Sequence, residues 1–318
     1  MAKKNITVSI MPTYKCRNHC PYCYLPTPYR YCGDNMLYYP YLGYIRKVEE
    51  KLRQIAKEYL ISTIEIYGGD LSLLPQQFLA DLNTLCHKFA LEVKYTWDNV
   101  ESAKELGIKV SQLNISINPE RRDFAKNLEI IKKFPQTNAI TVVTSRVIQT
   151  PTQEIMRWFN RYMGPRVTLM PLSNIGSSSY ITNYEYCNFV IRMLNEPTGG
   201  ALFTNYIKIV DAVRGRYSPA MENNIFINPE GAYCCVEWDD MGQEFFREFS
   251  TLREWQERCL QEVLERKQYC GTCEYYIHCM AEHFKRPDQY PEQHYKLKDI
   301  CNGYKPLIKW GIEHGLGC

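Results

Sequence analysis

The sequence predicts an α/β fold in which parallel strands alternate with helices and form a barrel or part of one. Two observations predict it. Six short β-type runs occur within residues 1–180, and amphipathic runs with helical periodicity separate them. Consecutive β-α units of this kind pair their strands in parallel through right-handed crossovers. In such folds the functional residues lie at the C-terminal ends of the strands, so we expect the site there.

Each element of this prediction rests on a local pattern. The β-type runs are Ile6–Met11, Thr63–Tyr67, Leu91–Thr96, Gln112–Ile117, Ala139–Thr144 and Arg166–Met170. The intervening apolar stripes begin at Ile45, Phe78, Leu128 and Ile155. Together these elements predict a barrel region over residues 1–180.

The pattern changes after this region. Residues 181–222 predict a helical connection, broken near Pro197–Gly200. Residues 223–318 predict a smaller C-terminal α+β domain. Its strands flank Asn228-Pro229-Glu230-Gly231, which is typical of a hairpin turn. An amphipathic helix follows, with Leu252, Trp255, Cys259, Leu260, Val263 and Leu264 on one stripe.

Composition excludes several classes. The net charge of +3 is spread along the chain, so there is no electrostatic footprint for nucleic acid. Neither a signal peptide nor an apolar run long enough to span a membrane is present. Fourteen cysteines in 318 residues without a signal peptide indicate a metalloprotein rather than a disulfide scaffold. We therefore expect a cytoplasmic protein with reduced thiols.

The first candidate site is the loop after the first strand. It carries Cys16, Cys20 and Cys23 in a C-x3-C-x2-C spacing. Three thiolates hold three irons of a [4Fe-4S] cluster and leave the fourth iron open to an exogenous ligand. A catalytic zinc site, which also uses three protein ligands, is the alternative. Zinc loops usually split their ligands into distant pairs, so the contiguous spacing favours iron–sulfur.

The second candidate follows the next strand and consists of Gly68, Gly69 and Asp70. Paired glycines allow a ligand to approach the backbone closely, and an acid after them can bind a ligand's ammonium group. A turn of this composition is common, so it indicates ligand binding only because it lies one β-α unit after the cysteine loop.

The two segments together resemble the radical S-adenosylmethionine (SAM) superfamily. The resemblance implies a (β/α)6 partial TIM barrel in which SAM binds the open iron, and in which one-electron reduction of SAM yields a 5′-deoxyadenosyl radical. It also implies that Gly68, Gly69 and Asp70 bind the methionyl ammonium and that Tyr22 lies beside the adenine. Asp70 replaces the more usual Glu and has a shorter reach. Weaker candidates for SAM contacts are Ser116 and Asn118, near the ribose, and Arg146, at the carboxylate.

The C-terminal part resembles the SPASM/twitch extension, which carries auxiliary [4Fe-4S] clusters. By this resemblance Cys270, Cys273, Cys279 and Cys301 hold one such cluster, with structural zinc as the alternative for four cysteines. His283 stands where a second cluster would need a cysteine, so we expect two clusters in the whole chain, one binding SAM and one auxiliary.

Cys234 and Cys235 have no place in these clusters. They are read as packing residues, as a substitute ligand, or as a thiol that returns a hydrogen atom to a substrate radical.

The expected function is hydrogen abstraction by a radical SAM enzyme, with a ribosomally synthesised peptide as substrate. The product would be a cross-link, an epimer or a rearranged backbone. Only 15 residues precede Cys16, so a separate recognition protein is expected to deliver the peptide, and flavodoxin or ferredoxin to supply electrons. Two alternatives stay open: a twitch-type dehydrogenase or epimerase of a sugar, aminocyclitol or other small metabolite, and a non-catalytic iron–sulfur or zinc protein.

Overall fold

The structure is a computed structural model of the chain. It describes residues 3–18, 20–23, 25, 41–159, 166–172, 177–217, 223–238, 244–279 and 304–317. Cys301 and His283, for which the sequence made predictions, lie outside these residues.

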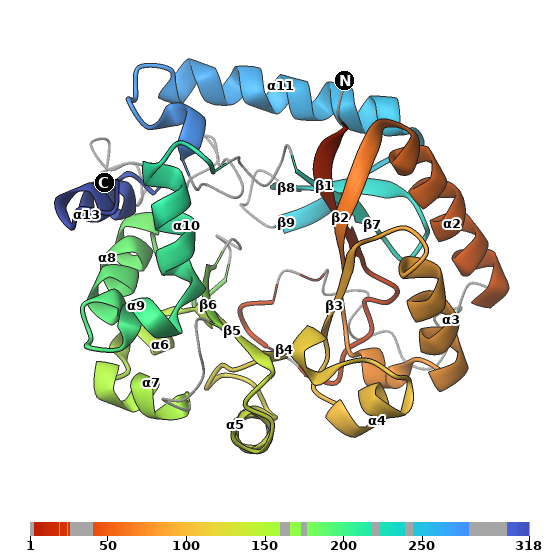
Figure 1. Cartoon of the computed structure of the whole chain (residues 1–318), viewed down its shortest axis with the longest axis horizontal. Helices are drawn as coiled ribbons and strands as arrows, with labels where there is room; N and C mark the ends of the chain where they lie inside the picture. Colours follow the sequence, from red (N-terminus) through yellow and green to blue (C-terminus); the bar gives the residue numbers. More distant parts are fainter. Residues whose placement is uncertain are drawn as a thin grey trace.

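One nine-stranded sheet organises the fold, in the order β6-β5-β4-β3-β2-β1-β7-β8-β9. The first six strands are β1 (Lys4–Ile10), β2 (Tyr59–Ile66), β3 (Glu92–Thr96), β4 (Leu113–Ser116), β5 (Asn138–Val143) and β6 (Val167–Pro171). Each pairs in parallel with the next in sequence. The sheet curves around the inside of the molecule with helices outside it (Figure 1). This is the open, partial barrel that the sequence predicts.

The helices between the strands form the outer layer (Figure 1). They are α2 (Tyr41–Glu58), α3 (Gln76–Cys86), α4 (Val100–Glu105), α5 (Phe124–Lys133), α6 (Ser145–Gln149) and α7 (Thr152–Trp158). Short 3-10 helices, η1 (Leu71–Leu73) and η2 (Val110–Gln112), precede α3 and β4. After β6 come α8 (Asn183–Leu194), α9 (Gly199–Leu202) and α10 (Thr204–Val213), so the expected helical connection is present, broken near Gly199.

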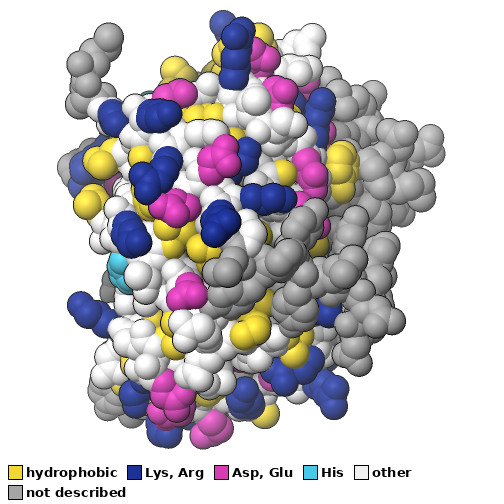
Figure 2. Space-filling view, turned by 90° about the vertical axis from the view of Figure 1, so that its right-hand side faces the viewer, with side chains coloured by type: hydrophobic (Ala, Val, Ile, Leu, Met, Phe, Trp, Pro, Cys, Tyr) yellow, Lys and Arg dark blue, Asp and Glu magenta, His cyan; other side chains and the backbone are white. Residues whose placement is uncertain are grey.

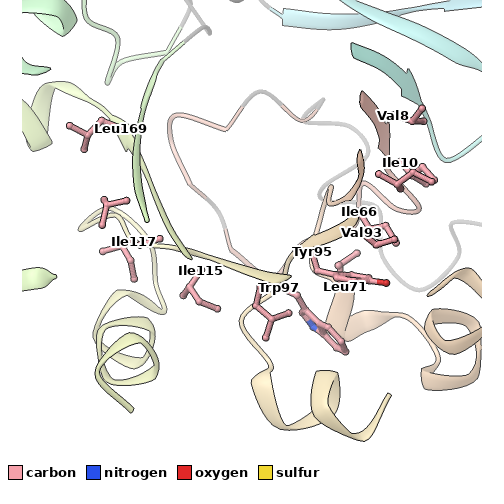
Figure 3. Close-up of a cluster of buried hydrophobic side chains, with 14 of the residues drawn as sticks. Val8, Ile10, Ile66, Leu71, Val93, Tyr95, Trp97, Ile115, Ile117 and Leu169 are labelled. Carbon is pink, nitrogen blue, oxygen red and sulfur yellow. The ribbon is translucent and has the colours of Figure 1, made fainter. Parts of the chain in front are cut away.

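The core lies between the sheet and these helices. Alternate strand residues point outward and are fully buried, among them Ile10, Ile66, Val93 and Ile115, which Figure 3 shows in a continuous layer. The residues between them face the inside of the curve and remain half-buried; Glu65 and Lys94 are register partners there. Period-two alternation in the sequence therefore separates an apolar outer face from a more polar inner face.

The C-terminal strands continue the same sheet. They are β7 (Asn224–Ile227), β8 (Tyr233–Trp238) and β9 (Glu244–Phe249). β7 pairs in parallel with β1, while β8 and β9 add to it antiparallel. The predicted hairpin is confirmed, with Asn228 Oδ1 accepting hydrogen bonds from the backbone of Glu230 and Ala232 in its turn. The domain boundary predicted at residue 222 therefore separates strands that belong to one continuous sheet.

The helix α11 (Leu252–Cys270) crosses the C-terminal strands, and a capping box of Thr251 and Glu254 starts it. It leads to η4 (Tyr276–His278), and α13 (Lys305–Glu313) packs against α8 and α10. None of the helices in the described ranges is long and apolar enough to cross a bilayer. The face shown in Figure 2 intersperses basic with acidic side chains, in keeping with the near-balanced net charge.

Candidate active site

The cysteine loop and the Gly68–Asp70 segment lie side by side at the C-terminal ends of β1 and β2. Three backbone hydrogen bonds join the two segments beyond the ends of the strands. They run from Tyr67 N–H to Ile10 O (3.0 Å), from Gly69 N–H to Thr13 O (2.8 Å) and from Asp70 N–H to Lys15 O (2.7 Å). The chain therefore enters the cysteine loop directly against Asp70, as the order of the β-α units predicted.

The structure explains the two glycines by close packing of the protein's own backbone, whereas the sequence analysis explained them by the close approach of a ligand. Gly68 has a φ of +136°, and a Cβ there would lie 2.6 Å from the carbonyl oxygen of Thr13. A Cβ on Gly69 would lie 1.9 Å from the carbonyl oxygen of Lys15. No side chain fits at either distance, so the glycines let the backbone leading into the cysteine loop pack on the end of β2.

Asp70 has two partners, one for each carboxylate oxygen. Its Oδ1 accepts a 2.9 Å hydrogen bond from Ser72 N–H, which caps η1. Its Oδ2 lies 2.7 Å from Nε of Arg17, a residue of the cysteine loop. The capping bond fixes the orientation of the side chain, and the second oxygen faces the loop.

The three loop cysteines sit in a partly buried setting. Cys20 is buried, while Cys16 and Cys23 are half-buried. A turn bond from Cys23 N–H to Cys20 O (3.1 Å) shapes the second half of the loop, and Asn18 N–H donates to Cys16 Sγ at 3.3 Å. Burial raises the pKa of the Cys16 thiol, with smaller contributions from Asp70 and Cys20 that also raise it. Asp70 therefore lies within electrostatic reach of this sulfur.

The donor set fits an iron–sulfur cluster. No three His, Cys, Asp or Glu side chains in the described ranges are arranged to hold a single metal ion. Thiolates around one zinc ion lie within about 4 Å of one another, since each Zn–S bond is near 2.3 Å. A [4Fe-4S] cluster takes each thiolate on a different iron, so its donors can stand farther apart. A loop with one buried and two half-buried thiols on separate positions suits the larger group.

Tyr22 packs the second half of the cysteine loop against residues of β5 and of the segment after β6. It is buried in a small cluster with Cys20 and Leu172, against which Val142 and Tyr180 pack. Ser177 Oγ, from the segment after β6, donates a 2.9 Å hydrogen bond to Pro21 O. The loop thus spans the opening from β1 towards β5 and β6.

The weaker SAM-contact candidates are spread over neighbouring strand ends. Ser116 ends β4 on the inner face and is half-buried. Asn118 is buried, donating to Val142 O at 2.8 Å and accepting from Glu120 N–H at 2.9 Å, so its side chain braces the loop after β4. Arg146 is exposed on α6.

A largely half-buried polar network beside the cysteine loop was not foreseen from the sequence. Asn18 Nδ2 donates to Asp123 Oδ2 at 3.0 Å, and Arg121 holds both oxygens of Asp123, at 2.8 and 2.9 Å. Asp98 hydrogen-bonds Asp123, and burial raises the pKa of Asp98. These residues follow β3 and β4, the strand ends where polar side chains of a barrel site are expected, which is the signal that could have found them.

Cys234 and Cys235 point to opposite faces of β8. Cys234 packs with Met11, Tyr14 and Leu25, on the side of the cysteine loop. Cys235 belongs to the main core, with Sγ 3.7 Å from Glu237 Oε1. Burial raises the pKa of both thiols, so both remain protonated at neutral pH.

The candidate auxiliary cysteines follow α11. Cys270 ends the helix, Cys273 N–H donates to Cys270 O at 2.9 Å, and Cys279 comes directly after η4. All three are half-buried. The buried guanidinium of Arg266 donates to the carbonyl oxygens of Tyr276 (3.3 Å) and Cys279 (3.4 Å), which ties this loop to the helix.

Sequence comparison finds one short match to a known protein, whereas structure comparison finds matches that cover most of the chain. No family model matches the chain. An uncharacterized protein of Archaeoglobus fulgidus is 27% identical over 111 residues, a match that spans 35% of this chain and only 25% of that protein.

Two solved enzymes share the architecture. The AdoMet-bound structure of anSMEcpe superposes with a TM-score of 0.64 over 99% of this chain and 98% of its own, at 13% identity. The structure of Streptococcus suis SuiB bound to S-adenosylmethionine gives 0.53 over 91% and 76%, also at 13% identity. Both solved structures hold bound S-adenosylmethionine. The partial barrel and the continuation of its sheet therefore give this chain the fold of these two S-adenosylmethionine-bound proteins.

Proposed function

We propose that this protein is a radical SAM enzyme that abstracts a hydrogen atom from a peptide substrate. The observation that carries the proposal is the direct contact between the two motifs. Hydrogen bonds from Gly69 and Asp70 to Thr13 and Lys15 place the carboxylate of Asp70 at the entrance of the loop that carries Cys16, Cys20 and Cys23.

Within this proposal the loop cysteines hold a [4Fe-4S] cluster, and Asp70 binds the methionyl ammonium of SAM. A cluster there would supply one electron, which breaks the bond between the SAM sulfur and C5′ and gives methionine and a 5′-deoxyadenosyl radical. Tyr22 would lie on the adenine side, where it is buried against Leu172 and Cys20. Ser116 lies on the inner face, where it can meet the ribose.

Cys270, Cys273 and Cys279 are proposed to hold one auxiliary [4Fe-4S] cluster together with Cys301. The Arg266 bonds to the loop carbonyls fix the backbone that presents two of these sulfurs. The fold supports this assignment, since the two enzymes compared above carry auxiliary domains.

The peptide substrate rests on a fold analogy. The structure of anSMEcpe with AdoMet and the peptide Cp18Cys superposes with a TM-score of 0.63 over 98% of this chain, at 12% identity. The inner face, with half-buried Glu65 and Lys94 on neighbouring strands, suits a polar substrate, which a peptide and a sugar both are, so the preference for a peptide comes from the fold comparison. A recognition protein and an electron-donating flavodoxin or ferredoxin are proposed partners.

The test is anaerobic incubation of the protein, with its clusters reconstituted, with SAM and dithionite. We expect 5′-deoxyadenosine, and none from a Cys16→Ala, Cys20→Ala, Cys23→Ala variant. Absence of 5′-deoxyadenosine from the intact protein would overturn the enzyme assignment.

The substrate is tested separately by adding the product of any small open reading frame next to the gene and measuring its mass. A change of mass in ordinary buffer supports a peptide substrate. A product whose mass changes only in deuterated buffer, by incorporation of solvent deuterium, supports it as well. Turnover of a sugar or aminocyclitol instead would replace it.

A further inference from the structure

The ion pair between Arg17 and Asp70 links the two motifs of the site through their side chains. Arg17 follows Cys16 directly, and its Nε lies 2.7 Å from Asp70 Oδ2. Asp70 is only 10% exposed at its side chain, whereas Arg17 is 64% exposed. The carboxylate is thus a fixed, sheltered group and the guanidinium a mobile one at the mouth of the site.

Only one donor of the guanidinium is used in this contact. Nε–H points at Asp70, while the forked geometry of an arginine offers its terminal nitrogens to a second acceptor. Asp70 cannot turn away to follow Arg17, because Ser72 N–H holds its other oxygen. A ligand that binds Asp70 must therefore meet or displace Arg17.

Displacement costs little. Ion pairs with a largely exposed partner contribute little net stability, because water screens the charges and the long side chain loses entropy on pairing. A ligand's ammonium group that reaches Asp70 can replace the guanidinium there. Arg17 then lies beside the part of the ligand that is next to the ammonium group.

In an α-amino acid that neighbouring group is a carboxylate. We propose that Arg17 binds the carboxylate of the methionyl group of SAM while Asp70 binds its ammonium, so that the pair selects ligands with a zwitterionic amino-acid end. This inference rests on the proposed function, and it assigns to Arg17 the role that the sequence suggested for Arg146, which lies exposed on α6.

The discriminating ligand is decarboxylated SAM, which keeps the amine and the sulfonium and lacks the carboxylate. Dissociation constants of SAM and of decarboxylated SAM are measured by anaerobic titration calorimetry on the cluster-loaded protein. Arg17→Gln is expected to weaken SAM about tenfold, the size of one charge-assisted hydrogen bond at a partly exposed site. It should leave decarboxylated SAM unchanged, and Arg17→Lys should restore part of the preference.

Arg53→Gln is the matched control. Arg53 is 66% exposed and pairs with Glu49 at 2.6 Å, but it lies on α2, away from the site. Its removal should change neither constant. Arg146→Gln is the competing variant and should also leave the preference intact.

Four outcomes overturn the proposal. Equal weakening of both ligands by Arg17→Gln would show general damage to the loop, and tighter binding of SAM would make Arg17 a competitor for Asp70. Loss of the preference in Arg146→Gln alone would move the role to that residue. Failure of the intact protein to bind SAM would overturn the proposed function, and the role of Arg17 with it, whereas the first three outcomes leave that function standing.

Discussion

The side-chain amide of Asn18 donates a 3.0 Å hydrogen bond to Asp123, a residue 105 positions later in the chain. The backbone of the same asparagine donates to Cys16 Sγ at 3.3 Å. Arg121 holds Asp123 from the other side and lowers the pKa of its carboxyl, while burial, together with the hydrogen bond to Asp123, raises the pKa of Asp98. The loop conformation between the first two cysteines is therefore held by side chains beyond β3 and β4.

Asp123→Leu should raise the reduction potential of the SAM-binding cluster. Asp123 is the carboxylate partner of Arg121, and Arg121 lies within electrostatic reach of Cys16 and Cys20. Without Asp123 the site loses a negative charge while Arg121 keeps its positive charge beside the loop, and positive charge near a cluster stabilises the reduced state. We expect an increase on the order of 50 mV, equivalent to about 1 kcal/mol for one electron. The measurement is an anaerobic titration followed by electron paramagnetic resonance.

Asp81→Leu on α3 serves as the control for that titration, because it removes a carboxylate away from the loop. An unchanged potential in Asp123→Leu, with full iron content, would show that the charges of Arg121 and Asp123 do not act on the cluster.

Gly69→Ala should disrupt the contact between the two motifs. Its Cβ would lie 1.9 Å from Lys15 O, so the segment before Cys16 must move. We expect a loss of about 2–4 kcal/mol in the free energy of unfolding, together with reduced iron at the SAM-binding site. Urea denaturation and iron analysis measure the two effects.

Gly199→Ala separates these effects. Its Cβ would lie 2.1 Å from Met193 O, between α8 and α9, so it should lower stability while iron loading persists. If Gly69→Ala kept its iron as well, the packing of Gly69 on Lys15 would not be what positions the loop.

Of the two cysteines of β8, Cys234 is the one on the side of the cysteine loop, and we expect it to return a hydrogen atom to the substrate radical. It faces Met11 and Leu25 beside the cysteine loop, whereas Cys235 faces the core beneath α11. In deuterated buffer Cys234→Ala should abolish deuterium in the product, while 5′-deoxyadenosine still forms. Cys235→Ala is the neighbouring control and should retain the label, measured by mass spectrometry. Labelled product from Cys234→Ala would exclude this role.

Cys270→Ala with Cys273→Ala should lower the iron content from about eight to about four per chain, since one of two [4Fe-4S] clusters loses half its ligands. Iron, sulfide and zinc are measured after anaerobic reconstitution. Cys86→Ala, which removes a buried thiol from the core, is the control and should keep about eight. Eight irons in the double variant, or zinc in place of iron in the intact protein, would refute the auxiliary assignment.

Much of the barrel was readable from local patterns. Strands such as Ile6–Met11 and Leu91–Thr96 were placed within two residues of β1 and β3, because buried parallel strands alternate clearly between two faces. The loop cysteines and Gly68–Asp70 were found because both motifs are short and contiguous. The reason for the glycines was missed, because the sequence does not show that Lys15 O passes within van der Waals distance of Gly69.

Other features depend on contacts between distant parts of the chain. The apolar stripe expected on α11 included Leu260 and Leu264, yet these residues are 61% and 60% exposed. The buried face instead continues through Glu262 and Arg266, because Arg266 is needed inside to bond the carbonyls of the following loop. Helical periodicity alone ranks leucine above arginine for burial and cannot foresee that demand.

The pairing of β7 with β1 has a consequence for the order in which the protein is made. The strand that leads into the cysteine loop gains its second neighbour only when residues 224–227 have been synthesised, more than 200 positions later. Until then one edge of β1 carries open N–H and C=O groups, which attract other chains. The first strand to be synthesised is thus among the last to gain both of its neighbours in the sheet.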